Sequence, residues 1–278
     1  MISWRQSIIR VHQRLFARRC FVPFHRGLYH FALRGLGVMN YEDFTVSGEQ
    51  YLLSRILPAV TGCGPCTVVD AGANLGGYSK LVLQVNPMAQ IFAFEPHPKA
   101  FAQLAAISND RFHALNFALG AEEGSTTIYD CAAIDGSEHA TLLRGVVERV
   151  YGDANLSEHV VARTRLDVAM RSLATHIHLL KIDTEGTELD VIRGCGRYLT
   201  ESRIDLIQFE FNSMNVYSRC FLLDFQNALP GYRLFRVLQD GVIALWPYQA
   251  IDDEVFAFQN ILAVRESLVP VVDRKHKG

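Results

Sequence analysis

The chain has 278 residues, of which 49% are hydrophobic and 20% are charged, and its formal net charge is −2. This length is enough for one large α/β domain with an extension or for two small domains, and the small net charge gives no reason to expect nucleic acid as a partner. Six cysteines at irregular spacings exclude a disulfide framework and predict reduced thiols in a cytoplasmic protein.

The N-terminal part of the chain differs in charge from the rest. Residues 1–41 contain seven arginines and no acidic residue. Trp4, Ile8, Val11 and Leu15 recur at helical spacing, which predicts a basic amphipathic helix. Three interpretations remain open: the helix docks on the domain, it contacts an anionic membrane surface or a lipid-linked substrate, or it is an organelle transit peptide.

Strands and helices alternate after this arm. Ser47 is a predicted helix N-cap, and Gln50 completes a capping box for a helix over 49–60. The expected strands, in chain order, are 66–72, 90–96, 112–120, 177–183, 204–211, 232–241 and 258–265. The expected helices between them are 76–86, 98–108, 187–199 and 220–229. Near-continuous apolar strands in repeated β-α units predict an α/β fold with a mostly parallel, doubly wound, Rossmann-like sheet.

This organisation predicts four regions. A basic arm over 1–40 precedes one domain over 41–268, and a basic tail follows over 269–278. The mixed, polar stretch 130–161 interrupts the domain and is predicted to be a lid or acceptor-binding insertion. No apolar run approaches the roughly 18 to 20 residues of a membrane span.

Cys63 and Cys66 enclose a Gly-Pro pair, as in the active site of thioredoxin-like redox proteins. In such sites the first cysteine begins a helix, but here Cys66 leads directly into a predicted strand. A zinc site would need a second pair of ligands, which the sequence does not supply. We therefore assign these two cysteines neither a redox nor a metal-binding role.

A glycine-rich turn follows the first strand. Asp70, Gly72 and Gly76 fall at the carboxyl end of that strand, where open α/β sheets hold ligands. The dinucleotide fingerprint requires glycine where this chain has Asn74, which argues against a nicotinamide or flavin cofactor. Glu95 ends the second strand, and a carboxylate there can accept both hydroxyls of a ribose. The turn and the carboxylate together predict a site for a cofactor that contains a nucleoside.

The succession VVDAGANLGGYS, FAFEPHP, NFALG, LLKIDTEGTELDVIRG and QFEFN, closing with NILAV, resembles the FkbM family of S-adenosylmethionine-dependent methyltransferases. The resemblance covers roughly 41–266, and KIDTEGTE is its most specific part. It implies the class I methyltransferase fold, S-adenosylmethionine as cofactor, and methylation of hydroxyls on sugars, glycolipids or macrolide natural products. The cofactor contacts that it implies here are Asp70, Gly72, Asn74, Gly76, Tyr78, Glu95 and Asn116.

Carboxylates gather after the strand over 177–183. Asp183 and Glu185 lie just past its end, and Glu188 is expected in the first turn of the next helix, where the helix dipole favours a negative charge. A hydroxyl must lose its proton as it takes a methyl group, so a positioned carboxylate suits the role of general base. We expect Asp183 to be this base, with Glu185 as the second choice.

Glu210 and Asn212 end the following strand. With Asp183 they offer hard oxygen ligands to a divalent metal, an arrangement that resembles the magnesium site of catechol O-methyltransferases. The alternative is that Glu210 hydrogen-bonds the methyl acceptor or neighbouring backbone. Further candidate acceptor contacts are His139, Arg144 and Arg163.

The leading functional hypothesis is therefore a cytoplasmic O-methyltransferase for a small-molecule or glycan acceptor, with peripheral membrane contact through the arm as an open question. One alternative is a methyltransferase of the same fold that acts on nitrogen or on a protein or lipid. The other alternative is a relic of the fold that binds the nucleotide without turnover.

Overall fold

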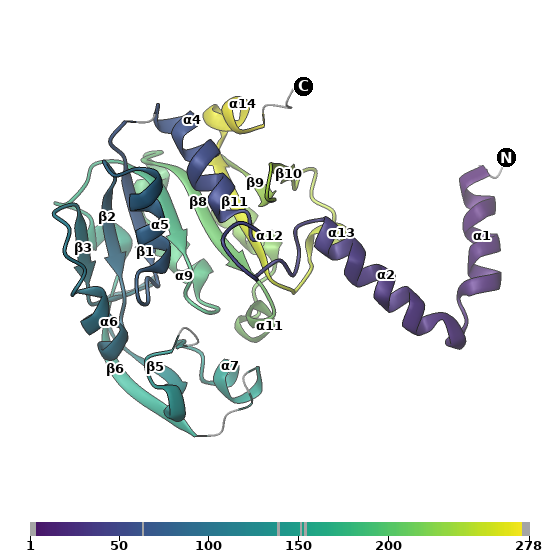
Figure 1. The fold of residues 1–278 in the computed structure, drawn as a ribbon, viewed down its shortest axis with the longest axis horizontal. Helices are drawn as coiled ribbons and strands as arrows, with labels where there is room; N and C mark the ends of the chain where they lie inside the picture. The colour runs from purple at the N-terminus through teal and green to yellow at the C-terminus, as the bar shows by residue number, and fades with distance from the viewer. Residues whose placement is uncertain (1–3, 63, 138–139, 151, 153–154, 274–278) are drawn as a thin grey trace.

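The computed structural model describes residues 4–62, 64–137, 140–150, 152 and 155–273. It contains a large mixed sheet between layers of helices, a small second sheet, and a two-helix arm that extends away from both (Figure 1). The predicted α/β class with a largely parallel main sheet is confirmed.

The main sheet has the strand order β10-β9-β11-β8-β7-β1-β2-β3. Its strands are β1 (Thr67–Ala71), β2 (Gln90–Phe94), β3 (Phe112–Leu115), β7 (Ile177–Ile182), β8 (Ile204–Phe211), β9 (Tyr232–Val237), β10 (Val242–Ala244) and β11 (Gln259–Arg265). Strands β3, β2, β1, β7 and β8 run parallel, while β11 inserts antiparallel between β8 and β9. The strand order reverses direction between β1 and β7, which are therefore the topological switch point of the sheet.

Both faces of the parallel strands are buried, each in its own hydrophobic core. Val69 of β1 and Leu180 of β7 pack under α9 and α12, while their neighbours Val68 and Leu179 pack under α4 and α5. Successive side chains of a strand point to opposite faces, so a strand buried on both sides must be apolar nearly throughout. This explains the continuous apolar runs in the sequence.

The helices largely follow the predicted positions. Those next to the main sheet are α3 (Glu49–Tyr51), a π-helical turn (Leu52–Ile56), α4 (Leu57–Thr61), α5 (Gly77–Val85), α6 (Pro98–Leu104), α9 (Glu188–Gly194), α10 (Arg197–Thr200) and α12 (Leu222–Ala228). The shorter ones are α8 (Leu166–Ala169), α11 (Met214–Ser218), α13 (Ala250–Asp253), η4 (Glu266–Leu268) and α14 (Val269–Val272). The single helix predicted over 187–199 is instead two helices, because the Gly-Cys-Gly sequence between them is a weak helix former.

The predicted capping box before β1 is wrong. Helix α3 begins after Gly48, which is its N-cap. The Ser47 hydroxyl donates a 2.8 Å hydrogen bond to the Glu49 carboxylate instead of capping the helix, and Gln50 accepts one from Thr45. Ser47 therefore orients an acidic side chain.

A small sheet of order β4-β6-β5 lies below the main sheet in Figure 1. Its strands are β4 (Ala118–Leu119), β5 (Gly124–Cys131) and β6 (Leu156–Thr164). The single strand predicted over 112–120 is wrong, because the chain turns at Asn116 and enters this second sheet. The predicted insertion over 130–161 consists of the far ends of β5 and β6 with η3 (Ala132–Ile134) and α7 (Arg144–Arg149) between them.

The arm comprises α1 (Trp4–Phe16), η1 (Arg19–Phe21) and α2 (Val22–Gly35). Among the described side chains, none of α1 is buried, and Leu33 is the one buried side chain of α2. The interpretation that the arm's first helix docks on the domain is therefore wrong, because other helices already cover the faces of the main sheet (Figure 1). Among the described residues, no helix is both long and apolar enough to cross a bilayer.

Candidate active site

The loops after β1 and β7 meet at the switch point. Gly72 has a φ of +83°, and a Cβ atom there would lie 1.8 Å from the carbonyl oxygen of Asp183. The amide of Asp183 donates a 2.9 Å hydrogen bond to the carbonyl oxygen of Ala71. Only glycine allows this approach, so the predicted cofactor turn and the predicted general base are held directly against each other.

Glu95 lies at the end of β2, beside this turn. Its two carboxylate oxygens accept hydrogen bonds of 2.8 Å and 2.7 Å from the backbone amides of Asn74 and His97. Burial raises the pKa of Glu95 to about 7, against the lowering effect of these two hydrogen bonds. These hydrogen bonds orient the side chain. Each carboxylate oxygen can accept a further hydrogen bond, so Glu95 still suits the two hydroxyls of a ribose.

Two of the predicted cofactor contacts lie beneath the turn. Asp70 is buried, its carboxylate accepts a 2.6 Å hydrogen bond from Ser79, and burial raises its pKa to about 6. Tyr78 is also buried, and its hydroxyl donates a 2.7 Å hydrogen bond to the side-chain carbonyl of Gln208. These two side chains are placed to support the turn from inside the domain.

Three other predicted contacts lie around the turn itself. Gly76, in the left-handed conformation, is the N-cap of α5. Asn74 donates from its side-chain amide to the carbonyl oxygen of Ser137, which ties the turn to the 130–161 insertion. Asn116 is exposed and donates to the carbonyl oxygen of Glu95. The structure thus gathers these residues at one edge of the sheet.

The predicted catalytic carboxylates form a cluster at the ends of β7 and β8. Burial, and then the charge of Asp183, raise the pKa values of Glu185 and Glu210 well above the ordinary value. Glu188 has a different role, because its carboxylate accepts hydrogen bonds from the amides of Thr184 and Gly186 and so shapes the loop. Asp183, Glu185 and Glu210 remain the candidates for chemistry.

The sequence reasoning missed a buried cation at the centre of this cluster. Lys181 is 2% exposed, and its Nζ atom lies 3.0 Å from a carboxylate oxygen of Asp183 and 3.9 Å from one of Glu49. The ring of Tyr78 lies 5.5 Å from the same nitrogen. Burial works to lower the pKa of Lys181, but the surrounding carboxylates outweigh it and raise that pKa. The lysine is therefore a fixed positive charge beside the predicted base.

Lys181 belongs to a polar row that crosses three neighbouring, mainly apolar strands of the sheet. It is the register partner of Asp70 on β1 and of Gln208 on β8. Gln208 in turn donates to the side chains of Glu49 and Asn260. The sequence did contain a signal for this row, because each of the three buried strands has a polar residue inside it. Buried polar groups almost always have hydrogen-bond partners, so these residues were candidates to contact one another.

The predicted metal set does not fit a divalent cation in this arrangement. Asn212 turns its amide nitrogen toward a carboxylate oxygen of Glu210, at 3.3 Å. Its side-chain oxygen accepts a 2.8 Å hydrogen bond from the backbone amide of Met214. The asparagine oxygen is therefore engaged by backbone, and the set with Asp183 does not form an open group of oxygen ligands.

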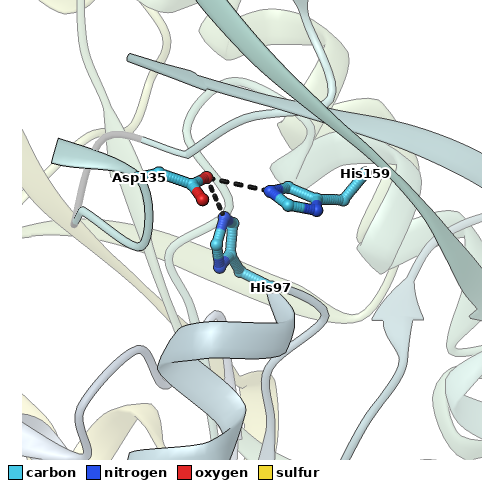
Figure 2. Close-up of side chains that lie close together, drawn as sticks. All are labelled: His97, Asp135 and His159. Carbon is cyan, nitrogen blue, oxygen red and sulfur yellow. Dashed lines mark hydrogen bonds and ion pairs between the residues drawn. The ribbon is translucent and has the colours of Figure 1, made fainter. Parts of the chain in front are cut away.

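A second polar cluster lies between the cofactor turn and the small sheet. The carboxylate of Asp135 stands between the imidazoles of His97 and His159, at 3.0 Å and 2.9 Å (Figure 2). Lys99 and Ser157 also contact it, at 2.6 Å each. Burial works to raise the pKa of Asp135, but the hydrogen bonds from these four side chains hold it well below its usual range.

This cluster offers three potential metal ligands, but its hydrogen bonds argue for a structural role. Nδ1 of His97 accepts a 3.3 Å hydrogen bond from the amide of Lys99, so in the neutral ring the proton is on Nε2 and points at Asp135. A metal would need that nitrogen's lone pair. Since the amide of His97 also holds Glu95, the cluster connects the small sheet to the predicted ribose site.

The remaining sequence candidates are engaged in other contacts or lie outside the described residues. Arg144 pairs with Glu148 at 2.8 Å, and Arg163 pairs with Glu122 at 2.9 Å. Cys66 is buried before β1. Two candidates lie outside the described residues: Cys63 and His139.

Comparison with known proteins decides the family. The model of the FkbM methyltransferase domain matches residues 70–235. The chain belongs to the FkbM methyltransferase family. It is therefore an S-adenosylmethionine-dependent methyltransferase, as the motifs at the ends of β1, β2, β7 and β8 predict.

Relatives of this FkbM methyltransferase include bacterial and fungal proteins. It is 27% identical over 188 residues to the 2-O-methyltransferase NoeI of Sinorhizobium fredii, covering 63% of this chain and 75% of NoeI. It is 28% identical over 153 residues to the methyltransferase sdnD of Sordaria araneosa, which corresponds to 46% of this chain and spans 59% of sdnD. Methyltransferase 1 of Beauveria bassiana is 28% identical over 158 residues, which is 61% of its length.

Among solved structures, the plantazolicin methyltransferase BpumL in complex with SAH aligns over 95% of this chain and 99% of its own, with a TM-score of 0.42 and 10% identity. The METTL16 methyltransferase domain aligns over 87% of this chain and 79% of its own, with a TM-score of 0.45 and 11% identity.

Proposed function

We propose that this methyltransferase transfers a methyl group to a hydroxyl of a sugar, a glycolipid or a related natural product. The observation that carries the proposal is the carboxylate of Asp183. It lies at the carboxyl end of β7 at the switch point, its side chain is 34% exposed, and Lys181 fixes it at 3.0 Å. The relative NoeI, named a 2-O-methyltransferase, supports an oxygen acceptor.

The donor set at the switch point fits S-adenosylmethionine. In the proposed arrangement the turn from Gly72 to Gly76, with Asn74, holds the methionine part, and Glu95 binds the ribose hydroxyls. Asn116 lies beside the adenine, while Asp70 and Tyr78 support the turn from beneath. When bound, the cofactor supplies a methyl group on a positively charged sulfur, and transfer of the methyl group discharges that sulfur.

Asp183 acts in this proposal as the general base. It accepts the proton of the acceptor hydroxyl while the oxygen takes the methyl group, a role typically worth 10²- to 10⁴-fold in rate. Glu185 and Glu210, whose pKa values are raised by burial and then by the charge of Asp183, lie beside this base and are placed to hydrogen-bond the acceptor. Alignment of the hydroxyl with the methyl group contributes the larger part of the acceleration, about 7 to 11 kcal/mol.

The region 130–161 is the acceptor lid within the domain 41–268. Two contacts support this role, because the hydroxyl of Thr141 donates to the carbonyl oxygen of Glu185 at 2.7 Å, and Ser137 accepts from Asn74. The lid therefore contacts both the cofactor turn and the catalytic loop. The arm over 1–40 is not part of the proposed catalytic unit, whereas α14, at the start of the predicted basic tail over 269–278, packs against the core of the domain.

The experiment combines binding with product analysis. Titration calorimetry should show binding of S-adenosylmethionine and of its demethylated product, and a flat trace with both on folded protein contradicts the proposed site. Incubation with isotope-labelled S-adenosylmethionine and a panel of glycans, nucleotide sugars and glycolipids should then yield a product that is one methyl group heavier. A base-stable methyl ether in that product supports methyl transfer to a hydroxyl oxygen, whereas a methylamine product contradicts it.

A further inference from the structure

The first helix of the arm presents an exposed apolar face. Trp4, Ile8, Val11 and Leu15 lie at intervals of three and four residues and therefore share one side of α1. All four are exposed, Trp4 by 70%. A soluble helix normally buries such a stripe against its own domain, so this face fits a partner outside the chain.

The second helix repeats this arrangement. Phe24, Leu28 and Phe31 follow one another at intervals of four and three residues on α2, and they are 56 to 79% exposed. A surface hollow between the two helices is lined by aromatic rings and cationic side chains. Its lining includes Phe16, Arg18, Arg19, His25, Arg26 and Tyr29. The arm, which extends away from the sheets in Figure 1, thus combines apolar faces with positive charge.

The charge of the arm is opposite to that of the rest of the chain. Residues 1–41 carry seven arginines and no acid, which leaves 20 cationic against 29 acidic residues, a formal charge of −9, on the remainder. A surface that attracts the arm and repels the rest must itself be negative. A second copy of the arm is disfavoured as the occupant, because it would bring seven more positive charges against the first seven.

We propose that the arm binds the surface of an anionic lipid bilayer. Helices α1 and α2 lie at the headgroup level, with their apolar faces inserted between lipids and their arginines on the lipid phosphates. Tryptophan, tyrosine and phenylalanine are favoured in this interfacial region. The domain, with its opposite charge, then remains off the membrane while the arm holds it nearby. This inference does not depend on the identity of the methyl acceptor.

The two tryptophans of the chain make the test direct. Trp4 is exposed on α1, whereas Trp246 packs on Phe235 with ring centroids 4.5 Å apart. In a Trp246→Phe variant of the full chain, Trp4 is therefore the only tryptophan reporter. Vesicles of phosphatidylcholine with 30% phosphatidylglycerol should shift its emission to shorter wavelength and co-sediment with the protein, and pure phosphatidylcholine vesicles should do neither.

Matched variants separate the contributions of charge and apolar surface. Arg10→Gln with Arg14→Gln should weaken binding roughly 25-fold, about five-fold for each arginine, and raised salt should weaken it further. The control pair, Arg55→Gln with Arg171→Gln on the exposed surface of the domain, should leave binding to the vesicles unchanged.

Removal of apolar side chains provides the second part of the test. Ile8→Asn with Leu15→Asn should abolish the emission shift, whereas Met88→Asn with Ile251→Asn, at exposed apolar residues of the domain, should not. All of these variants should keep the wild-type melting temperature and cofactor affinity. Equal binding to both kinds of vesicle, or to neither, overturns the proposal. So does a dimer in sedimentation velocity that depends on Trp4 and Leu15 and persists with vesicles, because the occupant would then be a second copy.

Discussion

The ammonium group of Lys181, on the buried strand β7, lies 3.0 Å from a carboxylate oxygen of Asp183 and 3.9 Å from one of Glu49. The lysine thereby joins a residue before the first strand to the predicted base after β7. A buried cation is stable only beside such partners. The two carboxylates in turn need the cation, because without it their negative charges would face each other uncompensated.

Replacement of the lysine should therefore be costly. Lys181→Met leaves Glu49 and Asp183 as neighbouring carboxylates without a cation, and we expect the free energy of unfolding to fall by about 3 to 5 kcal/mol. Denaturant unfolding at pH 7 measures this loss. Lys80→Met, at an exposed lysine of α5, should change it by less than about 0.5 kcal/mol. Similar stability of both variants would show that Lys181 does not hold the cluster together.

The proposed role of Asp183 separates binding from turnover. Asp183→Asn keeps the shape of the side chain but removes the basic oxygen, so kcat should fall at least about 100-fold. Calorimetry with S-adenosylhomocysteine should give a Kd within about two-fold of wild type, because the proposed cofactor contacts follow other strands. The control Asp190→Asn alters an exposed carboxylate of α9 that pairs with Arg193 and should leave both quantities unchanged. Full activity of Asp183→Asn would remove this residue from the mechanism.

The contact between Gly72 and Asp183 predicts a steric effect. In Gly72→Ala the new Cβ would lie 1.8 Å from the Asp183 carbonyl oxygen, so the two loops must separate. We expect a loss of at least about 3 kcal/mol of unfolding free energy together with loss of cofactor binding. Gly231→Ala is the matched control, since Gly231 has a similar φ of +85° but open space around it. That variant should cost only about 1 to 2 kcal/mol, and an equal cost at Gly72 would contradict the close approach of the loops.

Glu95 predicts a pH dependence with a definite sign. Its pKa is raised from 4.5 to about 7 in the folded protein, so it contributes stability that is complete below pH 4.5 and is lost as the pH rises through 7. In Glu95→Gln the side chain cannot ionise. Between pH 5 and pH 8 the unfolding free energy of the variant should therefore rise relative to wild type by up to about 3 kcal/mol.

Denaturant titrations of ligand-free protein at several pH values test this shift. Glu123→Gln, at an exposed glutamate, should show a constant difference from wild type over the same range. Cofactor affinity should fall in Glu95→Gln at every pH at which wild type binds. A constant difference for Glu95→Gln, or unchanged affinity, would contradict a buried ribose ligand at this position.

The sequence by itself determined the elements of this protein and the edge at which its chemistry lies. Strands such as β1 and β7 could be predicted because burial on both faces requires continuous apolar runs. Gly72 and Glu95 could be predicted as site residues because they follow the ends of such strands. The fold class, the family and the cofactor follow from these local patterns. The sequence predicted a single strand over 112–120. It did not show that the chain turns at Asn116, so that β3 belongs to the main sheet and β4 to the small sheet.

The tertiary structure alone decided how distant side chains meet. Glu49, Lys181 and Gln208 are far apart in the chain, and only the register of β7 on β8 and the path of the chain before β1 bring them together. The orientation of Asn212 and the exposed arm were decided in the same way. At these places a side chain's partners depend on which neighbouring donors and acceptors already have hydrogen bonds. The whole fold, rather than any one segment, determines this.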